Sequence, residues 1–191
     1  MGQALLAPLR HLGALGFWLF WLLAATGLYL YLRFDTSAAG AYASIGGLEW
    51  WFGGMLRSLH RYAADAFVIV TAAHLVKEIA AGRFRGLRAF SWISGVPLLW
   101  LLYASGIVGY WLVWDTRAQF SALATLEWMG MADAGAELVS DRLFSLFVFL
   151  HIGLPLALLA GMWVHVQRLN RPRTVLPRTL VLQGLILLLG L

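Results

Sequence analysis

Four long apolar stretches divide the chain, and each is long enough to cross a membrane as a helix. They lie at residues 12–32, 60–81, 90–114 and 143–166. Spanning about 30 Å of hydrocarbon takes about 20 predominantly apolar residues in a helix. Three stretches hold no Asp, Glu, Lys or Arg, whereas the second carries charged residues, Asp65, Lys77 and Glu78 among them. The pattern predicts an all-α, polytopic membrane four-helix bundle.

The segments outside these stretches predict smaller elements. Residues 180–191 are apolar but number only 12, too few to span. We therefore expect residues 1–175 to form the four-helix domain and residues 176–191 to lie in the membrane interface or pack on a partner. The loops at 34–56 and 115–141 predict short surface helices. The first apolar stretch exceeds the about 7–15 apolar residues of a signal peptide, so we expect it to be a retained span.

Basic residues gather on one side of the predicted bundle. The side that holds both termini carries nine of the 14 Lys and Arg residues: Arg10, Lys77, Arg83, Arg85, Arg88, Arg168, Arg171, Arg173 and Arg178. Most acidic residues fall on the other side. Because cytoplasmic loops are enriched in Lys and Arg, we expect an inner (cytoplasmic) membrane protein with both termini in the cytoplasm. The formal net charge of +5 is thus a topology signal, and no nucleic-acid partner is expected.

Composition narrows the chemistry further. Hydrophobic residues make up 61% of the chain and charged residues 12%, and the mean hydropathy is +0.78. Soluble domains average about 45–50% apolar and about 25% charged residues, so a soluble enzyme is excluded. The chain has no Cys. Disulfides, iron–sulfur clusters, Cys-bound zinc and the covalent attachment of a c-type haem are therefore excluded, and any metal must be held by His, carboxylate or Met.

Four of the five histidines fall inside the predicted spans, in two pairs with the same spacing. His60 and His74 are 14 residues apart, and so are His151 and His165. At about 100° per residue, 14 residues turn a helix by about 1,400°, close to four full turns, and rise ~21 Å. Both rings of a pair therefore point the same way, at two levels of the membrane. His11, at the membrane edge, is expected to be interfacial.

The second and fourth spans run in the same direction, which sets His60 level with His151 and His74 level with His165. Two imidazoles that face each other inside a four-helix bundle form the ligand set of a six-coordinate b-type haem. A full ligand set favours electron transfer over activation of a substrate. A hydrogen-bonded interior histidine, a proton relay, or a His-bound zinc or copper remain alternatives, but none of them needs the repeated spacing.

Pairs of glycines with the same 14-residue spacing occur in the other two spans. Gly13 and Gly27 are 14 residues apart in the first span, and Gly95 and Gly109 are 14 apart in the third. Only a residue without Cβ lets a flanking helix approach a macrocycle closely. We therefore expect Gly27 and Gly109 at an outer haem and Gly13 and Gly95 at an inner one.

Taken together, these residues resemble the N-terminal, haem-bearing half of cytochrome b from bc-type respiratory and photosynthetic complexes. The resemblance covers about residues 11–173. It rests on these groups: Gly13–Gly16 with Thr26 and Gly27; Arg57 to Tyr62 with His74; Ser91 to Gly95 and Gly106 to Asp115; and Arg142, His151, Pro155 and His165.

The resemblance implies further site residues. The four histidines would ligate the two haem irons in the pairs already given. Arg57 matches an arginine that pairs with an outer-haem propionate, Lys77 stands near the place of an inner-haem arginine, and Trp92 matches a tryptophan that contacts a propionate. The alternative for Arg57 and Lys77 is that they snorkel at helix ends.

The sequence also departs from the family pattern. Val113 replaces a proline that shapes the family's outer quinol pocket, and about one extra helical turn separates Arg142 from His151. The loop that completes that pocket belongs to the family's C-terminal half, which this chain does not contain. Asp65 is unusual for the family, and we expect it to pair with Arg61 at i,i+4, the alternative being a proton path.

The resulting hypothesis is a di-haem electron-transfer subunit of a quinol- or quinone-linked membrane oxidoreductase complex. Its outer partner would be a Rieske protein with cytochrome c, or an iron–sulfur or molybdenum dehydrogenase, and the departures above slightly favour the second. Lipid contacts follow from the spans, and a homodimer stays open. The rival readings are a non-catalytic haem scaffold and a His-metal transporter. A subunit of the formate-dehydrogenase or hydrogenase type is disfavoured by the two parallel histidine ladders.

A quinone site is expected on the basic side, beside the inner haem. His11, Glu78 and Arg168 lie there with Lys77, within about one turn of the predicted membrane boundary. Quinone reduction takes up protons together with electrons, so the site needs polar groups that reach water. The alternative is that these charges serve topology and propionate binding, while a partner subunit holds the quinone.

Overall fold

The computed structural model describes residues 10–131, 141–167, 169, 172 and 174–189. Its elements are α3 (Leu12–Tyr31), α4 (Ala41–Gly46), the π-helical turn η1 (Trp50–Gly54), α5 (Met55–Ala80), the 3₁₀ turn η2 (Gly86–Arg88), α6 (Ala89–Trp111), α7 (Thr116–Trp128), α8 (Asp141–Val166) and α9 (Arg178–Leu189). No strand occurs among these residues, so the predicted all-α class is confirmed.

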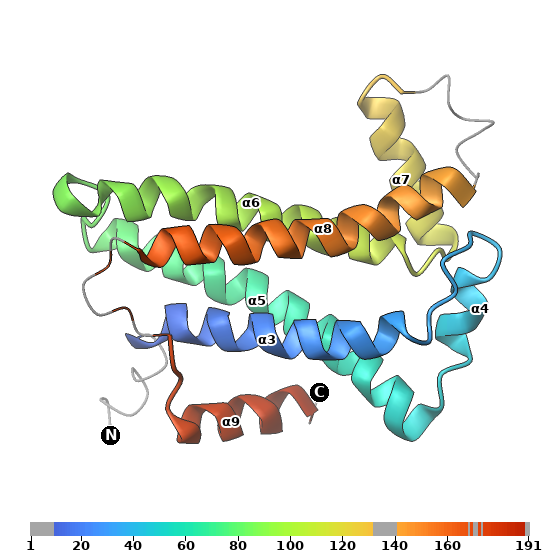
Figure 1. The fold of residues 1–191 in the computed structure, drawn as a ribbon, viewed down its shortest axis with the longest axis horizontal. Coiled ribbons are helices and arrows are strands. Elements are labelled where there is room, and N and C mark those ends of the chain that lie inside the picture. Colours follow the sequence, from blue (N-terminus) through green and yellow to red (C-terminus); the bar gives the residue numbers. More distant parts are fainter. Residues whose placement is uncertain (1–9, 132–140, 168, 170–171, 173, 190–191) are drawn as a thin grey trace.

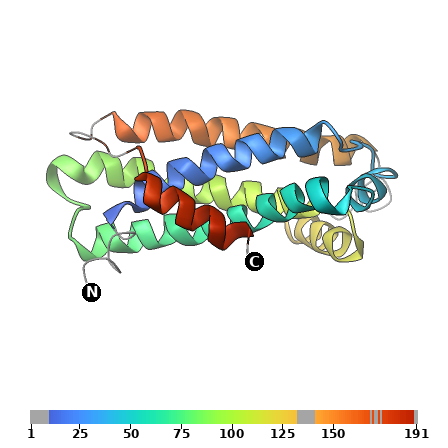
Figure 2. The ribbon, with the colours of Figure 1, turned by 90° about the horizontal axis from the view of Figure 1, so that it is seen from below.

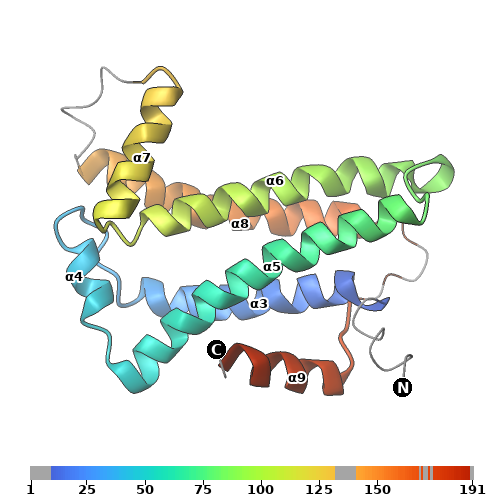
Figure 3. The ribbon, with the colours of Figure 1, turned by 180° about the vertical axis from the view of Figure 1, so that it is seen from behind.

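The four long helices α3, α5, α6 and α8 lie side by side and alternate in direction (Figure 1). α3 packs mainly on α5, α6 packs mainly on α8, and α5 also contacts α6. Helices α4 and α7 lie at one end of this bundle, which we call the outer end, and the start of α3 lies at the other, the inner end (Figure 3). Helices α5 and α8 therefore run in the same direction, from the outer to the inner end.

Three of the described helices, α3, α6 and α8, are long and apolar enough to cross a membrane. α5 has 26 residues and is long enough, but charged residues lower its hydropathy. Its buried residues Leu59, Ala63 and Phe67 are four apart and form one stripe that faces the bundle. The charges lie off that stripe, so the helix keeps an apolar face for packing despite its composition.

Helix bounds differ from the sequence prediction mainly at the start of α5. The helix begins at Met55, earlier than the predicted His60, and follows η1 without a break. The N–H of Gly54 donates to the C=O of Glu49 at 2.8 Å, a π-type bond that leads into α5. Nothing between Met55 and His60 stops a helix, because Gly and Pro are absent there.

The core consists of two clusters along the bundle. The central cluster joins α3, α5, α6 and α8 through residues such as Leu19, Phe67 and Leu158. The outer cluster joins α6, α7 and α8 with the start of α4. Along α8 the outer cluster ends at Val148 and the central one begins at Leu158. The stretch of α8 between them carries His151.

The last helix, α9, packs beside α5 and α3 (Figure 2). Leu188 is buried in the central cluster. A Cβ on Gly184 would lie 3.3 Å from the ring of Trp18, so α9 approaches α3 closely at this glycine. Within the described residues, the apolar C-terminal segment thus contacts the bundle of its own chain.

The short helices expected in the outer loops are present as α4, η1 and α7. Asp115 caps α7, and its side chain accepts the N–H of Ala118 at 2.8 Å. Asp141 accepts the N–H of Ala38 at 2.9 Å and so ties the loop before α4 to the start of α8. Residues 132–140 of the second predicted loop lie outside the described residues.

Phe144 offers a test of the outer core, because its side chain is fully buried on α8 whereas Phe149 on the same helix is 70% exposed. Phe144→Ala should lower the free energy of unfolding by about 3–5 kcal/mol, since it leaves a cavity. Unfolding by SDS in mixed micelles, followed by circular dichroism, measures the change. Phe149→Ala is the control and should cost far less. Equal losses would contradict this description of the core.

Candidate cofactor site

Two histidines from the parallel helices α5 and α8 face each other toward the outer end of the bundle. The ring centres of His60 and His151 are 6.3 Å apart, and the ring planes are inclined by 72°. The structure thus brings together the outer pair that the sequence predicts to be level. Both rings lie between helices, and neither makes an ion pair among the described residues.

His60 is held by a hydroxyl group of the neighbouring helix α3. Oγ1 of Thr26 lies 2.9 Å from Nδ1 of His60 and also donates to the C=O of Leu22 at 2.8 Å. Because the hydroxyl hydrogen goes to that carbonyl, the oxygen accepts from the imidazole, so the hydrogen of His60 is on Nδ1. The lone pair is therefore on Nε2, which is free to bind a metal.

The same arrangement holds His165 on α8. Oγ of Ser94 donates to the C=O of Phe90 at 2.8 Å and lies 3.1 Å from Nδ1 of His165. His151 uses a carbonyl instead, since its Nδ1–H donates to the C=O of Ser105 at 3.0 Å. Nδ1 of all three rings is thus within hydrogen-bond distance of an oxygen, an arrangement that suits a hydrogen on Nδ1 and a metal at Nε2. Metal-bound histidines in proteins are fixed in this way by an acceptor for the second nitrogen.

The predicted inner pair is His74 on α5 and His165 on α8, whose rings pack against Gly13 and Gly95 of the neighbouring helices. Nδ1 of His74 is buried and has no hydrogen-bond partner. The nearest acceptor is the carboxylate of Glu78, whose Oε1 is 4.0 Å away on the next turn of α5. Among the four histidines, His74 is thus the one whose Nδ1 has no hydrogen-bond partner.

Each predicted glycine packs against one histidine ring of the neighbouring helix. The nearest ring atom to an added Cβ would be 3.1 Å away for Gly27 and His60, 2.5 Å for Gly109 and His151, 3.1 Å for Gly95 and His165, and 3.8 Å for Gly13 and His74. The outer glycines meet outer rings and the inner glycines meet inner rings, as the register predicts. The physical reason differs from the expected one, because the space that a Cβ would fill belongs to the imidazole itself.

The outer pair fits one metal ion between two imidazoles. A metal–imidazole bond is about 2 Å long and the ring centre lies about 1.2 Å beyond nitrogen, which puts two opposed ring centres about 6.4 Å apart. The observed spacing of 6.3 Å agrees. Among the described residues, no three His, Asp or Glu side chains gather as a metal site. Two opposed imidazoles leave the remaining coordination positions of an ion open, an arrangement that fits the iron of a macrocycle such as haem.

The residues expected at the propionates have different surroundings. Arg57 is exposed in the first turn of α5. Nζ of Lys77 lies 3.6 Å from Oε1 of Glu78, so its charge faces a carboxylate of the protein. Trp92 packs against Phe84, with ring centres 6.2 Å apart.

The residues expected at a quinone site share the inner end of the bundle. His11 precedes α3, and its Nδ1 is buried without a hydrogen-bond partner. Glu78 lies near the end of α5. Arg168 lies outside the described residues. The structure therefore gives two of the three predicted residues a place at this end but records no contact between them.

The predicted ion pair between Arg61 and Asp65 is wrong. Both side chains are exposed, and the ion pairs of the described residues all involve Glu78. Exposed i,i+4 pairs contribute only about 0.3–0.5 kcal/mol, too little to hold two flexible side chains in one geometry.

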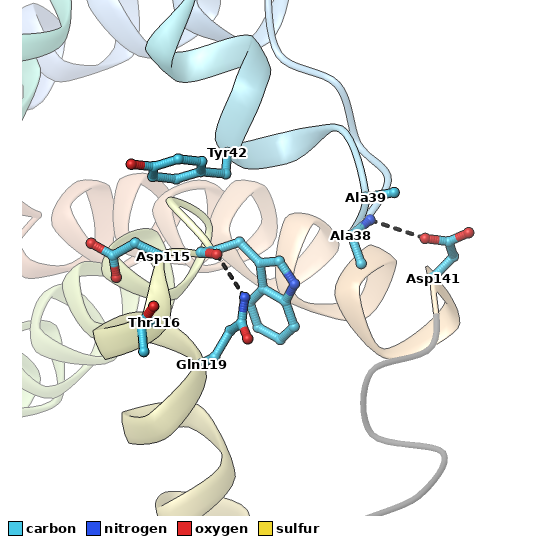
Figure 4. A pocket seen from close by; sticks show the side chains of 8 residues that line it. Ala38, Ala39, Tyr42, Asp115, Thr116, Gln119 and Asp141 are labelled. Atoms are coloured by element: carbon cyan, nitrogen blue, oxygen red, sulfur yellow. Dashed lines mark hydrogen bonds between the residues drawn. The ribbon is translucent and has the colours of Figure 1, made fainter.

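A cavity of about 800 Å³ opens at the outer end, between α4 and α7 (Figure 4). Its lining includes Tyr42, Asp115 and Asp141. Trp114 adjoins it with φ of 55°, packed on Phe144 with ring centres 5.1 Å apart. The backbone turns sharply at this residue, directly after Val113.

Sequence reasoning named Thr26 and Ser94 as parts of family motifs but did not assign them, or Ser105, to the histidine rings. Thr26 and Ser105 are the buried polar residues among those described, at 4% and 7% exposure. Thr26 precedes Gly27 and Ser94 precedes Gly95. A hydroxyl residue directly before a glycine that faces a histidine is therefore the signal that could have identified two of the partners.

Comparison with known proteins gives one consistent family. The family described as cytochrome b/b6/petB matches residues 5–172. The cytochrome b subunit of the cytochrome bc complex of Chlorobaculum thiosulfatiphilum is 31% identical over 176 residues, which cover 84% of this chain and 41% of that protein. Cytochrome b6 of Mastigocladus laminosus is 34% identical over 93 residues, covering 48% of this chain and 43% of that protein. Cytochrome b6 of Heliobacterium mobile is 26% identical and covers 81% of this chain and 78% of that protein.

A solved structure shares the fold. A chain of a hyperthermophilic respiratory Complex III superposes with a TM-score of 0.73 over 95% of this chain and 56% of that chain, at 19% identity. At that identity the likeness concerns the fold alone. This chain spans less than half the length of the first two relatives given above, 41% and 43%.

The glycine contacts give a graded test on α6. A Cβ on Gly109 would lie 2.5 Å from Cε1 of His151, whereas a Cβ on Gly106 would meet nothing within 4 Å. Gly109→Ala should displace the ring and weaken haem binding at the outer pair by about 10–100-fold. Haem retained per chain after purification in mild detergent measures this. Gly106→Ala is the control and should retain haem; equal retention in both variants would refute the packing argument.

Proposed function

Because this chain belongs to the cytochrome b/b6/petB family, we propose that it conducts electrons across a membrane through two b-type haems held by its histidines. His60 and His151 hold the outer haem, and His74 and His165 hold the inner one. The observation that carries the proposal is the pair of opposed imidazoles on α5 and α8, 6.3 Å apart, with Nδ1 of each bound to an acceptor.

Neighbouring helices hold three of these rings. Thr26, Ser94 and the carbonyl of Ser105 set the tautomers of three rings. Gly27, Gly95 and Gly109 let the neighbouring helices close on the rings. When bound, each haem would supply one-electron chemistry at its iron, and the two histidine pairs would be the residues that hold it. Rings fixed by neighbouring helices would need little rearrangement as the electron is exchanged.

The two histidine levels span most of the membrane. His60 and His74 are 14 residues apart on one straight helix, which corresponds to ~21 Å along the axis. With a metal centre at each level, a single chain could pass electrons between a redox partner at the outer end and one at the inner end. Arg57 at the outer level and Lys77 with Trp92 at the inner level supply the groups that pair with haem propionates.

The outer electron partner is a subunit of the bc type in this proposal. One relative is the cytochrome b subunit of a cytochrome bc complex, and others are cytochromes b6. That supports a Rieske iron–sulfur protein over a molybdenum or iron–sulfur dehydrogenase at the outer surface. The second candidate retains one specific observation, Val113, which stands where the family has the proline of its outer quinol pocket.

Quinone exchange belongs to the inner end, beside His74 and His165. His11, Glu78 and Arg168 are the groups of the chain proposed to contact it. We place the inner end and both termini in the cytoplasm, because the inner side carries most of the Lys and Arg residues. Proton uptake by a reduced quinone then comes from the cytoplasm.

Single substitutions of the histidines should separate the two haems. His74→Leu removes a ligand of the inner pair and should eliminate one of two b-type absorption components, while the outer component remains. His60→Leu should do the reverse. Optical redox titration of the purified protein measures both components. Loss of both haems in every variant would indicate one shared site, and absence of a reducible absorption band in the unmodified protein would favour the His-metal transporter.

A quinone label should locate the reactive pocket. A photoaffinity quinone is expected to label the inner end, near His11 and the end of α5, because protons and the inner haem meet there. Peptide mapping by mass spectrometry identifies the site. Labelling confined to the region of Trp114 and Glu127, at the outer end, would overturn this assignment.

A further inference from the structure

The four histidines are not held alike. Three of them give the Nδ1 hydrogen to a neutral acceptor of a neighbouring helix, a hydroxyl or a carbonyl. His74 has no such partner, although its Nδ1 is buried. The reason lies in α3: the residue before Gly13 is Leu12, whereas Thr26 stands before Gly27. The flanking helix therefore offers His74 no hydroxyl.

Glu78 fills the place of the missing acceptor. It follows His74 by one helical turn, and its Oε1 lies 4.0 Å from Nδ1 of His74. The side chain of Glu78 is 21% exposed. A carboxylate thus lies beside His74 of the inner pair, whereas the acceptors of His60 and His151 in the outer pair are uncharged.

The end of α5 holds this carboxylate in position. Gly82 adopts φ of 66°, a left-handed conformation that ends the helix and folds the chain back. The N–H of Arg83 then donates to the C=O of Glu78 at 3.0 Å. Nη1 of Arg83 lies 3.2 and 3.3 Å from the two carboxylate oxygens, and Nζ of Lys77 lies 3.6 Å from one of them. These two cations pair with the carboxylate of Glu78 and orient it.

We propose that Glu78 is the positioning residue of the inner haem: its carboxylate accepts the Nδ1 hydrogen of His74 and lowers the reduction potential of the iron that His74 binds. The two groups are 4.0 Å apart in this structure, so the proposed hydrogen bond requires the carboxylate to move toward Nδ1 of His74. The inference rests on the proposed function, since it assumes a haem at the inner pair.

The sign of the effect follows from charge. A carboxylate that accepts from a ligating imidazole makes the imidazole a stronger donor to the metal. Its negative charge also favours Fe³⁺ over Fe²⁺. His74 would hold the iron, which would supply the one-electron chemistry, and the role of Glu78 would be to accept the Nδ1 hydrogen of His74. The inner haem is therefore harder to reduce than it would be with a neutral acceptor.

Glu78→Gln in the full chain tests the proposal, with both haems followed by optical redox titration. The potential of the inner haem should rise, so that the Fe³⁺/Fe²⁺ ratio at fixed ambient potential falls about tenfold, equal to about 59 mV. The outer haem should not shift. Glu127→Gln, an exposed carboxylate on α7 at the outer end, is the matched control and should leave the inner haem unchanged.

Glu78→Asp separates the hydrogen bond from charge acting through space. Aspartate keeps the charge but withdraws the oxygens from His74 by one methylene. The proposal predicts that Glu78→Asp also raises the inner potential and changes the electron paramagnetic resonance g-values of the ferric inner haem in the same direction as Glu78→Gln. If Glu78→Gln fails to retain the inner haem, the Glu78→Asp variant still provides the test.

Each outcome decides. Unchanged inner potential in Glu78→Gln, with both haems bound, would overturn the proposal and leave Glu78 as an anchor of the helix end. An Asp variant identical to the unmodified protein, beside a shifted Gln variant, would overturn the hydrogen bond. A protein without two reducible haems before any substitution would instead overturn the proposed function.

Discussion

The structure depends on how an apolar bundle accommodates an imidazole ring. The ring brings one N–H that needs an acceptor and one lone pair that must point in a fixed direction. Hydrocarbon and Leu side chains can satisfy neither need, and an unsatisfied buried donor costs about 1–3 kcal/mol. Every ring therefore requires a polar atom from a neighbouring element and enough room for that element to approach.

Helices α3 and α6 each provide a polar atom and room for close approach through two adjacent residues. Thr26 and Gly27 are adjacent on α3 and contact the same ring, and Ser94 and Gly95 do so on α6. The hydroxyl returns its own hydrogen to its helix and accepts with its oxygen, so no polar group is left over. The absent Cβ lets the backbone come close enough for that bond. For His60 and His165 a polar contact and a packing contact thus form a single local arrangement. His151 uses the carbonyl of Ser105 instead, and His74 has no acceptor from a neighbouring helix.

Periodicity was sufficient to predict the architecture, because it reflects the physics that dominates this fold. Long apolar stretches gave the four helices, and the 14-residue spacing of His60 and His74 gave two levels. Spacing could not predict tautomers or partners, since these depend on how far each helix is rotated. It predicted a helix-surface pair of Arg61 and Asp65 that does not form, and it missed Ser105, whose backbone carbonyl, not its side chain, accepts from His151.

The distribution of charge along α5 completes the physical account of the bundle. Leu59, Ala63 and Phe67 form the buried stripe, whereas Arg57 and Asp65 are exposed. Charged side chains on a spanning helix are costly in hydrocarbon unless they reach water or another polar group. An apolar stripe alone would hold α5 in the bundle, but its charged residues require surroundings other than lipid chains. These charges account for why α5, although long enough to span, does not reach the hydropathy that α3, α6 and α8 meet.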